Sequence, residues 1–371
     1  MAAVSGVQKE VLVREIPDLV IVEIPGYGIK YDKNRALTIL RLIFSIPKIL
    51  IRVKRENAWI RRWARLGQPD LIISDNRYGL HVAGIPSVFM THQLLIRTPW
   101  GPIADRWLQR INYSFIRRFS LCWVPDTGGE TNLAGELSHP PRMPRVPVRY
   151  VGWLSRFTPC PPEAGASVSG PDPIPPNPAH LTVSDPIPPD GIDLLVLLSG
   201  PEPQRTLLEK KIMDQVAHYS GHVVLVRGLP NQTAPLTSPP HVKVYNHLPA
   251  ADLGVLIRSS GQIICRSGYS TVMDLVRLGR RAIMIPTPGQ TEQEYLGHYL
   301  ASRGWALCVD QKGFSLIDAL TAAREMNTPQ IGQLPDPFTG EGLLQQAIAD
   351  VLSSAARQSI NSAMAAQPTS I

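Results

Sequence analysis

The sequence predicts an α/β protein built from two doubly wound domains, each a parallel sheet with helices on both faces. Three observations support this fold class. Short apolar runs alternate with longer helical patterns through both halves of the chain, as in parallel sheets joined by crossover helices. A stretch rich in proline and polar residues separates the two halves. The length of 371 residues is ample for two domains.

The expected elements follow from this alternation. In the first half, short runs bounded by turn residues predict strands at Leu19–Glu23, Asp70–Ser74, Ser87–Met90 and Leu121–Pro125, with helices near Leu37–Leu66 and Ile103–Phe119. In the second half, strands are expected at Asp193–Leu198, Val223–Arg227, Val242–Tyr245, Gln262–Cys265, Arg281–Ile285 and Ala306–Val309. Helices are expected there at Gln204–Tyr219, Tyr269–Leu278, Glu292–Arg303, Leu316–Met326 and Gly342–Ala356.

The segment between the halves predicts a domain boundary. It repeats the pentapeptide Asp-Pro-Ile-Pro-Pro and has too few apolar side chains to offset the entropy lost on ordering. We therefore expect an N-terminal domain over residues 1–157, a proline-rich linker or insertion over 158–191, a C-terminal domain over 192–356 and a disordered tail over 357–371.

Composition narrows the function classes. Hydrophobic residues make up 44% and charged residues 18% of the chain, as in soluble enzymes. The formal charge of +7 suits anionic partners such as phosphates or anionic lipids. No zinc-finger, helix-turn-helix or RNA-binding motif is present, so nucleic acid is not an expected partner. The first residues lack the apolar core of a signal peptide, which predicts a cytoplasmic protein.

The stretch from Ile263 to Gly304 carries the chemistry. A buried strand ends at Arg266-Ser267-Gly268 and a helix begins at once, so free N–H groups of that helix favour an anion at the carboxyl edge of the sheet. Asp274 lies further along the same helix, where it can accept hydrogen bonds from a ribose diol. The next strand leads to the polar run Gln290-Thr291-Glu292-Gln293, which opens another helix at the same edge.

This pattern resembles the family 28 C-terminal domain of the GT-B glycosyltransferases. The resemblance implies two Rossmann-like domains that face each other across a cleft, with a nucleotide-sugar donor held by the C-terminal half. By the same resemblance, Asp274 stands where an acidic residue binds the ribose and Gln293 where a glutamine contacts the donor sugar. Ser267 and Gly268 stand near the sugar and phosphates, and Gln290 opens the helix that carries Gln293.

Three further segments extend the donor site. Leu198-Ser199-Gly200 is similar to the family's loop against the donor phosphate. Pro201 and Pro203 follow it and lack N–H groups, which weakens this anion site unless Arg205 contributes. Arg156 ends a segment similar to one that supplies a diphosphate-binding arginine. Asn246 begins a segment where the family reads the base through backbone groups.

The N-terminal half resembles the acceptor side more loosely. Asp75 follows one expected strand and His92 the next, and both are candidates for the base that deprotonates the acceptor. Plain alternatives remain open: Asp75 as a turn former, His92 as a structural histidine, Arg156 as a surface cation and Asp274 as a solvated helix residue. The family's first strand and glycine-rich loop, which carries its usual base, are expected to be missing because the first 19 residues are typical of the helix that follows, and this puts activity in question.

Residues 41–65 mix Leu, Ile and Trp with Arg and Lys. They predict either an amphipathic surface pair of helices broken at Pro47 or a patch that lies on a membrane surface. The second interpretation suits a lipid-linked acceptor and a location at the inner face of the membrane.

The sequence therefore predicts a glycosyltransferase that moves a hexose or N-acetylhexosamine from a UDP-sugar to a hydroxyl acceptor. No Asp-x-Asp motif is present, so a metal site and a cofactor are not expected. Two alternatives stay open: a UDP-sugar 2-epimerase of the same fold, and a non-catalytic remnant that binds sugar nucleotides.

Overall fold

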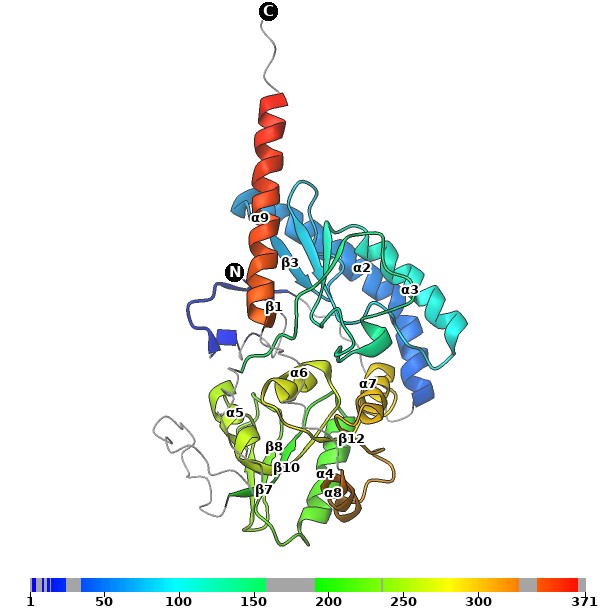
Figure 1. The fold of residues 1–371 in the computed structure, drawn as a ribbon, viewed down its shortest axis with the longest axis vertical. Coiled ribbons are helices and arrows are strands. Elements are labelled where there is room, and N and C mark those ends of the chain that lie inside the picture. Colours follow the sequence, from blue (N-terminus) through cyan, green and yellow to red (C-terminus); the bar gives the residue numbers. More distant parts are fainter. Residues whose placement is uncertain are drawn as a thin grey trace, which may run out of the picture. The chain divides into compact units, whose positions relative to one another are not determined.

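The chain divides into two units (Figure 1). The computed structural model describes residues 2–4, 9, 12–13, 15–24, 35–157, 191–234, 236–326 and 339–365. Unit 1 comprises Met1–Phe44 and Ser155–Leu334, and unit 2 comprises Ser45–Leu154 and Pro335–Ile371. The predicted linker at 158–191 lies outside the described residues except for Gly191.

Unit 1 contains a six-stranded sheet with the order β12-β11-β10-β7-β8-β9, in which every neighbouring pair is parallel. The strands are β7 Ile192–Leu197, β8 Val223–Val226, β9 Val242–Tyr245, β10 Ser260–Cys265, β11 Ile283–Met284 and β12 Leu307–Cys308. All six expected strands of the second half are present, β9 with the expected bounds.

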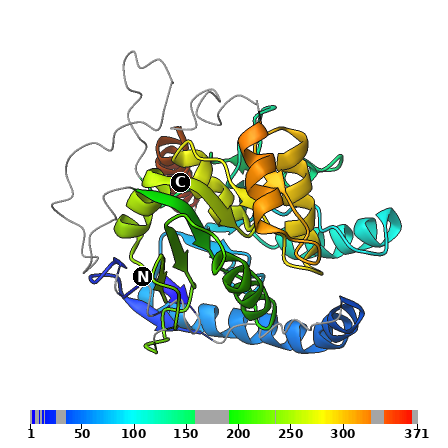
Figure 2. The ribbon, with the colours of Figure 1, turned by 90° about the horizontal axis from the view of Figure 1, so that it is seen from below.

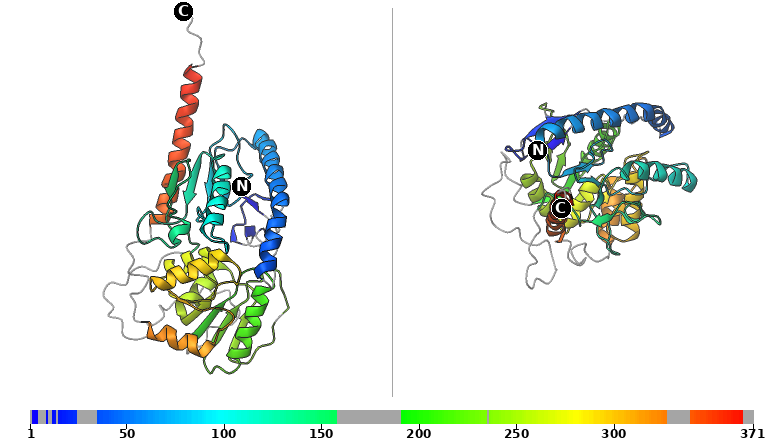
Figure 3. Two further views of the ribbon diagram at one scale, coloured as in Figure 1. Left: turned by 90° about the vertical axis from the view of Figure 1, so that its right-hand side faces the viewer. Right: turned by 90° about the horizontal axis from the view of Figure 1, so that it is seen from above.

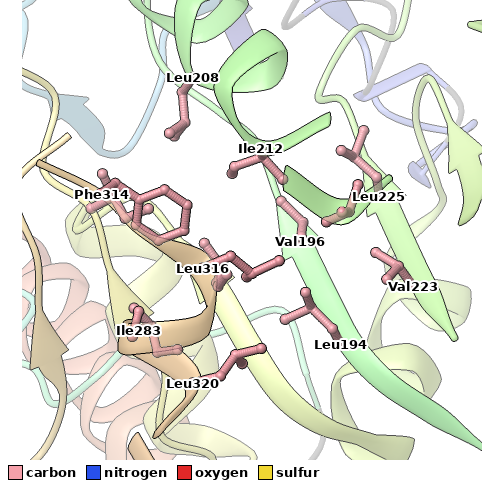
Figure 4. Close-up of a cluster of buried hydrophobic side chains, with 14 of the residues drawn as sticks. Leu194, Val196, Leu208, Ile212, Val223, Leu225, Ile283, Phe314, Leu316 and Leu320 are labelled. Carbon is pink, nitrogen blue, oxygen red and sulfur yellow. The ribbon is translucent and has the colours of Figure 1, made fainter. Parts of the chain in front are cut away.

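Helices cover both faces of this sheet, as Figure 2 shows for α4 and α5. They are α4 Gln204–Val216, α5 Ala250–Ser259, α6 Tyr269–Arg277, α7 Thr291–Ser302 and α8 Leu316–Glu325. Because side chains alternate along a strand, Leu194 and Val196 of β7 face α4 and α8, where they pack against Ile212 and Leu316 (Figure 4). This cluster anchors the strands whose carboxyl ends carry the predicted donor residues.

Unit 2 contains a four-stranded parallel sheet in the order β3-β4-β5-β6. The strands are β3 Ile72–Asp75, β4 Ser87–Met90, β5 Leu121–Val124 and β6 Val148–Tyr150. The helices α3 Pro102–Ile116 and α9 Thr339–Ala365 lie on opposite faces (Figure 3). Phe89 packs with Ile116 of α3, whereas its neighbour Val88 packs with Ala347 and Val351 of α9.

The position of α9 differs from the predicted domain boundary at residue 356. The helix belongs to unit 2, where Asp350 pairs with Arg149 of β6 at 2.6 Å. It also continues to Ala365, through the start of the expected tail. The apolar face of α9 is buried on the sheet of unit 2, which is why a helix at the end of the chain joins the first half of the sequence.

The start of the chain also differs from expectation. Ala2–Val4 forms a strand, β1, which pairs in parallel with β2 Ile21–Glu23 in a separate two-stranded sheet. The expected strand at 19–23 is therefore present, but it clusters with unit 1 instead of joining β3. Within unit 1, the carboxylate of Glu15 accepts a hydrogen bond from the N–H of Ala250 at 3.0 Å.

The predicted break at Pro47 is wrong, because α2 runs without interruption from Arg35 to Gly67. Proline removes one backbone hydrogen bond, and the turns on both sides of Pro47 continue the helix. Beyond Pro47, Val53, Glu56, Ile60 and Ala64 are buried at helical spacing. Within the described ranges, no helix has the length and apolar character needed to cross a bilayer.

Candidate functional site

The carboxyl ends of β7, β10 and β11 lie at one edge of the unit 1 sheet, because these strands are parallel. The loop after β7 carries Ser199 and Gly200, both exposed. Gly200 has φ +97°, and a Cβ there would lie 3.3 Å from Oγ1 of Thr287 in the loop after β11. The left-handed backbone and the close approach both favour glycine at this position.

Arg266, directly after β10, joins these loops from inside the protein. It is fully buried, and its guanidinium donates to the carbonyl oxygens of Gln204, Ile285 and Pro286 at 2.9–3.1 Å, and to Oε1 of Gln311 at 2.8 Å. Burial lowers the pKa of Arg266 to about 10, so the group is still charged at neutral pH. The cation therefore holds the start of α4 and the end of β11 to the end of β10.

Ser267, Gly268 and Gln293 are brought together beside this anchor. Oγ of Ser267 donates to the carbonyl oxygen of Gln293 at 2.7 Å, and Oε1 of Gln293 accepts from the N–H of Thr287 at 2.9 Å. The amide nitrogen of Gln293 lies 4.0 Å from the Cβ position of Gly268. These contacts orient the Gln293 side chain with its NH₂ group toward the start of α6, where it can donate to a ligand hydroxyl.

Gly268 and Gln290 occupy the N-cap positions of α6 and α7, and neither helix start has a side-chain cap. Gln290 is half-buried and its N–H donates to the carbonyl oxygen of Thr287 at 3.0 Å. The uncapped N–H groups at the start of α6 are suited to an anion. Of the predicted donor residues, Ser267, Gly268, Gln290 and Gln293 thus gather around two helix N-termini at the same sheet edge.

Asp274 and Arg156 also come together, but they pair with each other. Oδ1 of Asp274 accepts from Oγ of Ser155 at 2.7 Å, and Oδ2 lies 3.3 Å from Nε of Arg156. Burial raises the pKa of Asp274, although Ser155 and Arg156 oppose this. A ribose diol would have to share or replace these partners, and a diphosphate would compete for the half-exposed Arg156 guanidinium.

The side chain of Asn246 is bonded to other parts of the protein. Its side-chain oxygen accepts from Arg227 at 2.7 Å, and its amide donates to the carbonyl oxygens of Gln232 and Ala234 at 2.9 and 3.0 Å. Its own carbonyl accepts from the N–H of Leu229 at 2.7 Å. Asn246 therefore organises the loop after β8.

Arg205, which could have supported an anion at the loop after β7, is engaged inside the protein. Arg205 is buried and its guanidinium contacts Glu202 at 2.6 Å and Glu209 at 2.7 Å. Glu209 also accepts from Arg227 at 2.8 Å. Burial raises the pKa of Glu209, but the hydrogen bonds from Arg227 and Arg205 outweigh it, and the net pKa is lowered. The charge of Arg205 is thus neutralised by Glu202 and Glu209.

The two candidate bases lie at the corresponding edge of the unit 2 sheet. Asp75 ends β3 and is in register with Met90, two residues before His92. The surrounding protein raises the pKa of Asp75 by desolvation, and the nearby His92 opposes the rise. Asn76, at φ +52°, donates to Asp75 at 3.3 Å. The structure therefore brings both candidates into one electrostatic neighbourhood: Asp75 is exposed as a residue while its carboxyl group is partly desolvated, and His92 is half-buried.

Sequence reasoning missed three contributors to the donor edge: Ser155, Thr287 and the interior role of Arg266. Thr287 is fully buried, and its Oγ1 has no hydrogen-bond partner in the described part of the chain. The sequence feature that could have revealed Thr287 is its position directly after Pro286, between an expected strand and the polar start of a helix. Across the described residues, no group of three His, Cys, Asp or Glu side chains is arranged to hold a metal ion.

Comparison with known proteins identifies this edge. The model of the glycosyltransferase family 28 C-terminal domain matches residues 202–331. This part of the chain is thus similar to the family 28 C-terminal domain. Asn246, Asp274 and the Ser267, Gly268 and Gln293 cluster all lie within the family 28 domain, whereas Arg156, Ser199 and Gly200 lie before its matched start.

Two curated relatives match the chain over 84 residues. Both carry the name UDP-N-acetylglucosamine--N-acetylmuramyl-(pentapeptide) pyrophosphoryl-undecaprenol N-acetylglucosamine transferase. One is from Methylorubrum extorquens (strain PA1), 34% identical, and one is from Methylorubrum populi, 33% identical. The match covers 20% of this chain and spans 23% of the length of each relative.

Solved structures establish the fold of the chain. The glycotransferase of kitacinnamycin aligns with a TM-score of 0.56 at 15% identity, over 95% of this chain and 89% of that one. Arabidopsis thaliana UGT89C1, solved with UDP-L-rhamnose, aligns with a TM-score of 0.50 at 13% identity, over 94% and 85%. Together with the family 28 domain and the two parallel sheets, these similarities assign the GT-B fold with two Rossmann-like domains.

Proposed function

We propose that the protein is a glycosyltransferase that moves a hexose or N-acetylhexosamine from a UDP-sugar to a hydroxyl acceptor, without a metal ion. The observation that carries this proposal is the cluster of Ser267, Gly268 and Gln293 at the uncapped start of α6, inside the family 28 domain. The relatives' name supports UDP-N-acetylglucosamine as the donor and a polyprenyl diphosphate as the carrier of the acceptor.

The chemistry divides between the two units. The acceptor oxygen attacks the anomeric carbon, the bond from that carbon to the diphosphate oxygen breaks, and UDP leaves with the bonding electron pair. Unit 1 binds the donor and stabilises the charge of the leaving diphosphate through the N–H groups of α6, the loop at Ser199 and Gly200, and Arg156. Asp75 or His92 of unit 2 takes the acceptor proton.

Isothermal titration of UDP into the whole chain tests the donor assignment. We expect binding by the parent protein, and a loss of roughly 1–3 kcal/mol in Asp274→Asn if the ribose bonds to the carboxylate. Asp318→Asn, at the first turn of α8, is the matched control and should bind as the parent does. Equal UDP affinity in parent and Asp274→Asn would remove Asp274 from the site, and no binding by the folded parent would reject the donor assignment.

The two alternatives differ in their products. A UDP-sugar 2-epimerase converts donor alone, whereas a transferase releases UDP only when an acceptor is supplied. A non-catalytic remnant binds UDP and converts nothing. Incubation of the protein with UDP-N-acetylglucosamine, with and without lipid-linked acceptor, therefore separates the three, with the epimerised sugar or free UDP as the readout.

We also propose that residues 41–65 contact the membrane surface, which would place the protein at the inner, cytoplasmic face. Beyond Pro47, the outer side of α2 exposes Ile51 beside Lys54 and Arg55, and Arg61, Arg62 and Arg65 follow on it. Sedimentation with phosphatidylglycerol vesicles tests this. Arg61→Glu with Arg65→Glu should release the protein, and unchanged sedimentation would reject the contact.

A further inference from the structure

A pocket of about 970 Å³ in unit 2 is lined by six arginines. Arg106, Arg110 and Arg117 come from α3 or its C-terminal end, Arg142 and Arg145 from the loop before β6, and Arg97 from the segment before α3. On α3, Arg106, Arg110 and Arg117 are four and seven residues apart, a spacing that places them on one side of the helix. The pocket is therefore the meeting point of three segments that each supply cations.

The wall of the pocket is held in place by hydrogen bonds. The hydroxyl of Tyr113 donates to the carbonyl oxygen of Arg142 at 2.6 Å. Gln109, which is 8% exposed, donates to the Tyr113 oxygen at 3.0 Å. These contacts tie the loop that carries Arg142 to α3, so the arginines surround a preformed space.

The positive charge of the pocket is largely uncompensated. Its two acidic lining residues, Asp105 and Glu136, both contact Arg97, and Asp105 also accepts from the N–H of Thr98 at 2.7 Å. Over the ranges that the structure describes, no carboxylate lies within ion-pair distance of the other five lining arginines. Guanidinium groups that repel each other around one space are stabilised by an anion placed between them.

We propose that this pocket binds an organic phosphate, a phosphoester or diphosphate with an apolar body. Arginine matches phosphate oxygens with paired N–H donors, so several of these side chains can contact one phosphate group. The volume exceeds that of a phosphate ion and reaches the upper range of small-molecule pockets. Leu95, Pro102 and Met143 line the same space and can receive the remainder of the ligand. The site uses no residue of the donor edge and extends the proposed function.

Titration of inorganic pyrophosphate and of glycerol 3-phosphate into the whole chain tests the site. The variants are Arg110→Gln and Arg142→Gln, which change exposed side chains from two of the segments. Arg118→Gln is the matched control, because Arg118 is exposed, follows Arg117 directly and lies outside the lining. We expect each pocket variant to bind the two phosphate compounds at least roughly tenfold more weakly, because one charge-assisted contact is lost. The control should bind them with the affinity of the parent.

The result that overturns the site is no binding by the parent, or equal weakening in Arg118→Gln and in the pocket variants. UDP titration of the same variants should give the parent affinity, which separates failure of this site from failure of the donor assignment. Vesicles of phosphatidylcholine with phosphatidic acid identify the source of the phosphate. Vesicle binding lost in Arg110→Gln but kept in Arg118→Gln indicates a lipid headgroup, whereas binding of the soluble compounds alone indicates a soluble phosphoester.

Discussion

The loops at the carboxyl edges of the two sheets hold their polar groups in different ways. In unit 1, the buried Arg266 donates to the start of α4, Arg205 and Glu209 of α4 are buried and pair with each other, and Ser267 donates to the backbone of α7. In unit 2, Asp75 at the end of β3 is exposed as a residue, although the protein around its carboxyl group raises its pKa by desolvation. The unit 1 edge is therefore held by contacts inside the protein, whereas the candidate base at the unit 2 edge lies at the surface.

The difference has a physical reason. A donor site that stabilises a leaving diphosphate gains most from N–H groups that need not reorganise during the reaction, which requires loops fixed from inside. A proton acceptor must instead reach the hydroxyl group of its substrate, so its side chain cannot be tied up inside the protein. We infer that unit 1 supplies binding and unit 2 supplies proton transfer.

The largest expected effect is on the transfer rate when the base of unit 2 is removed. Asp75→Asn or His92→Gln, whichever residue is the base, should lower the rate roughly 10²- to 10⁴-fold, with UDP affinity unchanged. Steady-state rates and UDP titration measure the two effects. Unchanged rates in both variants would place the base elsewhere.

If Asp75 is the base, the pH dependence of the transfer rate gives a second test of its role. The base acts when deprotonated and its pKa is raised by desolvation, so the rate should rise with pH through a value above the usual range for aspartate. Asp70→Asn, before β3, is a control that should keep both the rate and its pH dependence.

Removing the buried cation of unit 1 should have the next largest effect. Arg266→Leu removes the guanidinium donor from the carbonyl oxygens of Gln204, Ile285 and Pro286, and each buried group left unsatisfied costs about 1–3 kcal/mol. We expect a loss of at least roughly 3 kcal/mol in the free energy of unfolding, measured with urea. Arg258→Leu, at an exposed site on α5, should change it by less than about 0.5 kcal/mol. Similar small losses in both variants would show that the loops do not depend on Arg266.

A glycine in each unit compares the packing of the two units at smaller scale. Gly228 and Gly84 have φ +69° and +83°, and alanine in this conformation costs roughly 1–2 kcal/mol. A Cβ at Gly228 would also lie 2.5 Å from the carbonyl oxygen of Leu198, whereas one at Gly84 meets nothing within 4 Å. Gly228→Ala should therefore destabilise its unit more than Gly84→Ala destabilises its own, by thermal unfolding. Equal losses of stability would mean that the backbone around Gly228 can shift to accept a Cβ atom at no extra cost.

The sequence predicted regular elements well where one local signal dominated. β4 and β9 have the expected bounds, because each is a short run of β-forming residues between turns. Helix α5 was missed, since Gly254 interrupts its apolar pattern and β10 begins immediately after Ser259. Strand β6 was missed because it is three residues long, with Arg149 at its centre.

The site was predictable only as far as local motifs reach. The loops at Ser267 and Gly268 and at Gln293 follow from strand ends and helix starts. The partners of Arg266 come from positions 19 to 62 residues away in the chain, and α9 joins β6 through a contact across 201 residues. The arginines of the pocket are scattered over residues 97–145 and look like ordinary surface charges until the fold collects them.

The central claim is that the start of α6 and Gln293 hold a nucleotide sugar. The most direct measurement is isothermal titration of UDP and UDP-N-acetylglucosamine into the whole chain and into Gln293→Ala, with Gln215→Ala on α4 as a control for amide loss elsewhere in unit 1. The account predicts that the parent and the control bind both ligands, and that Gln293→Ala keeps its UDP affinity but loses roughly 1 kcal/mol or more for the sugar nucleotide, the contribution of one hydrogen bond. Equal affinities of Gln293→Ala and the parent for UDP-N-acetylglucosamine, or no binding of either ligand by the parent, would contradict it.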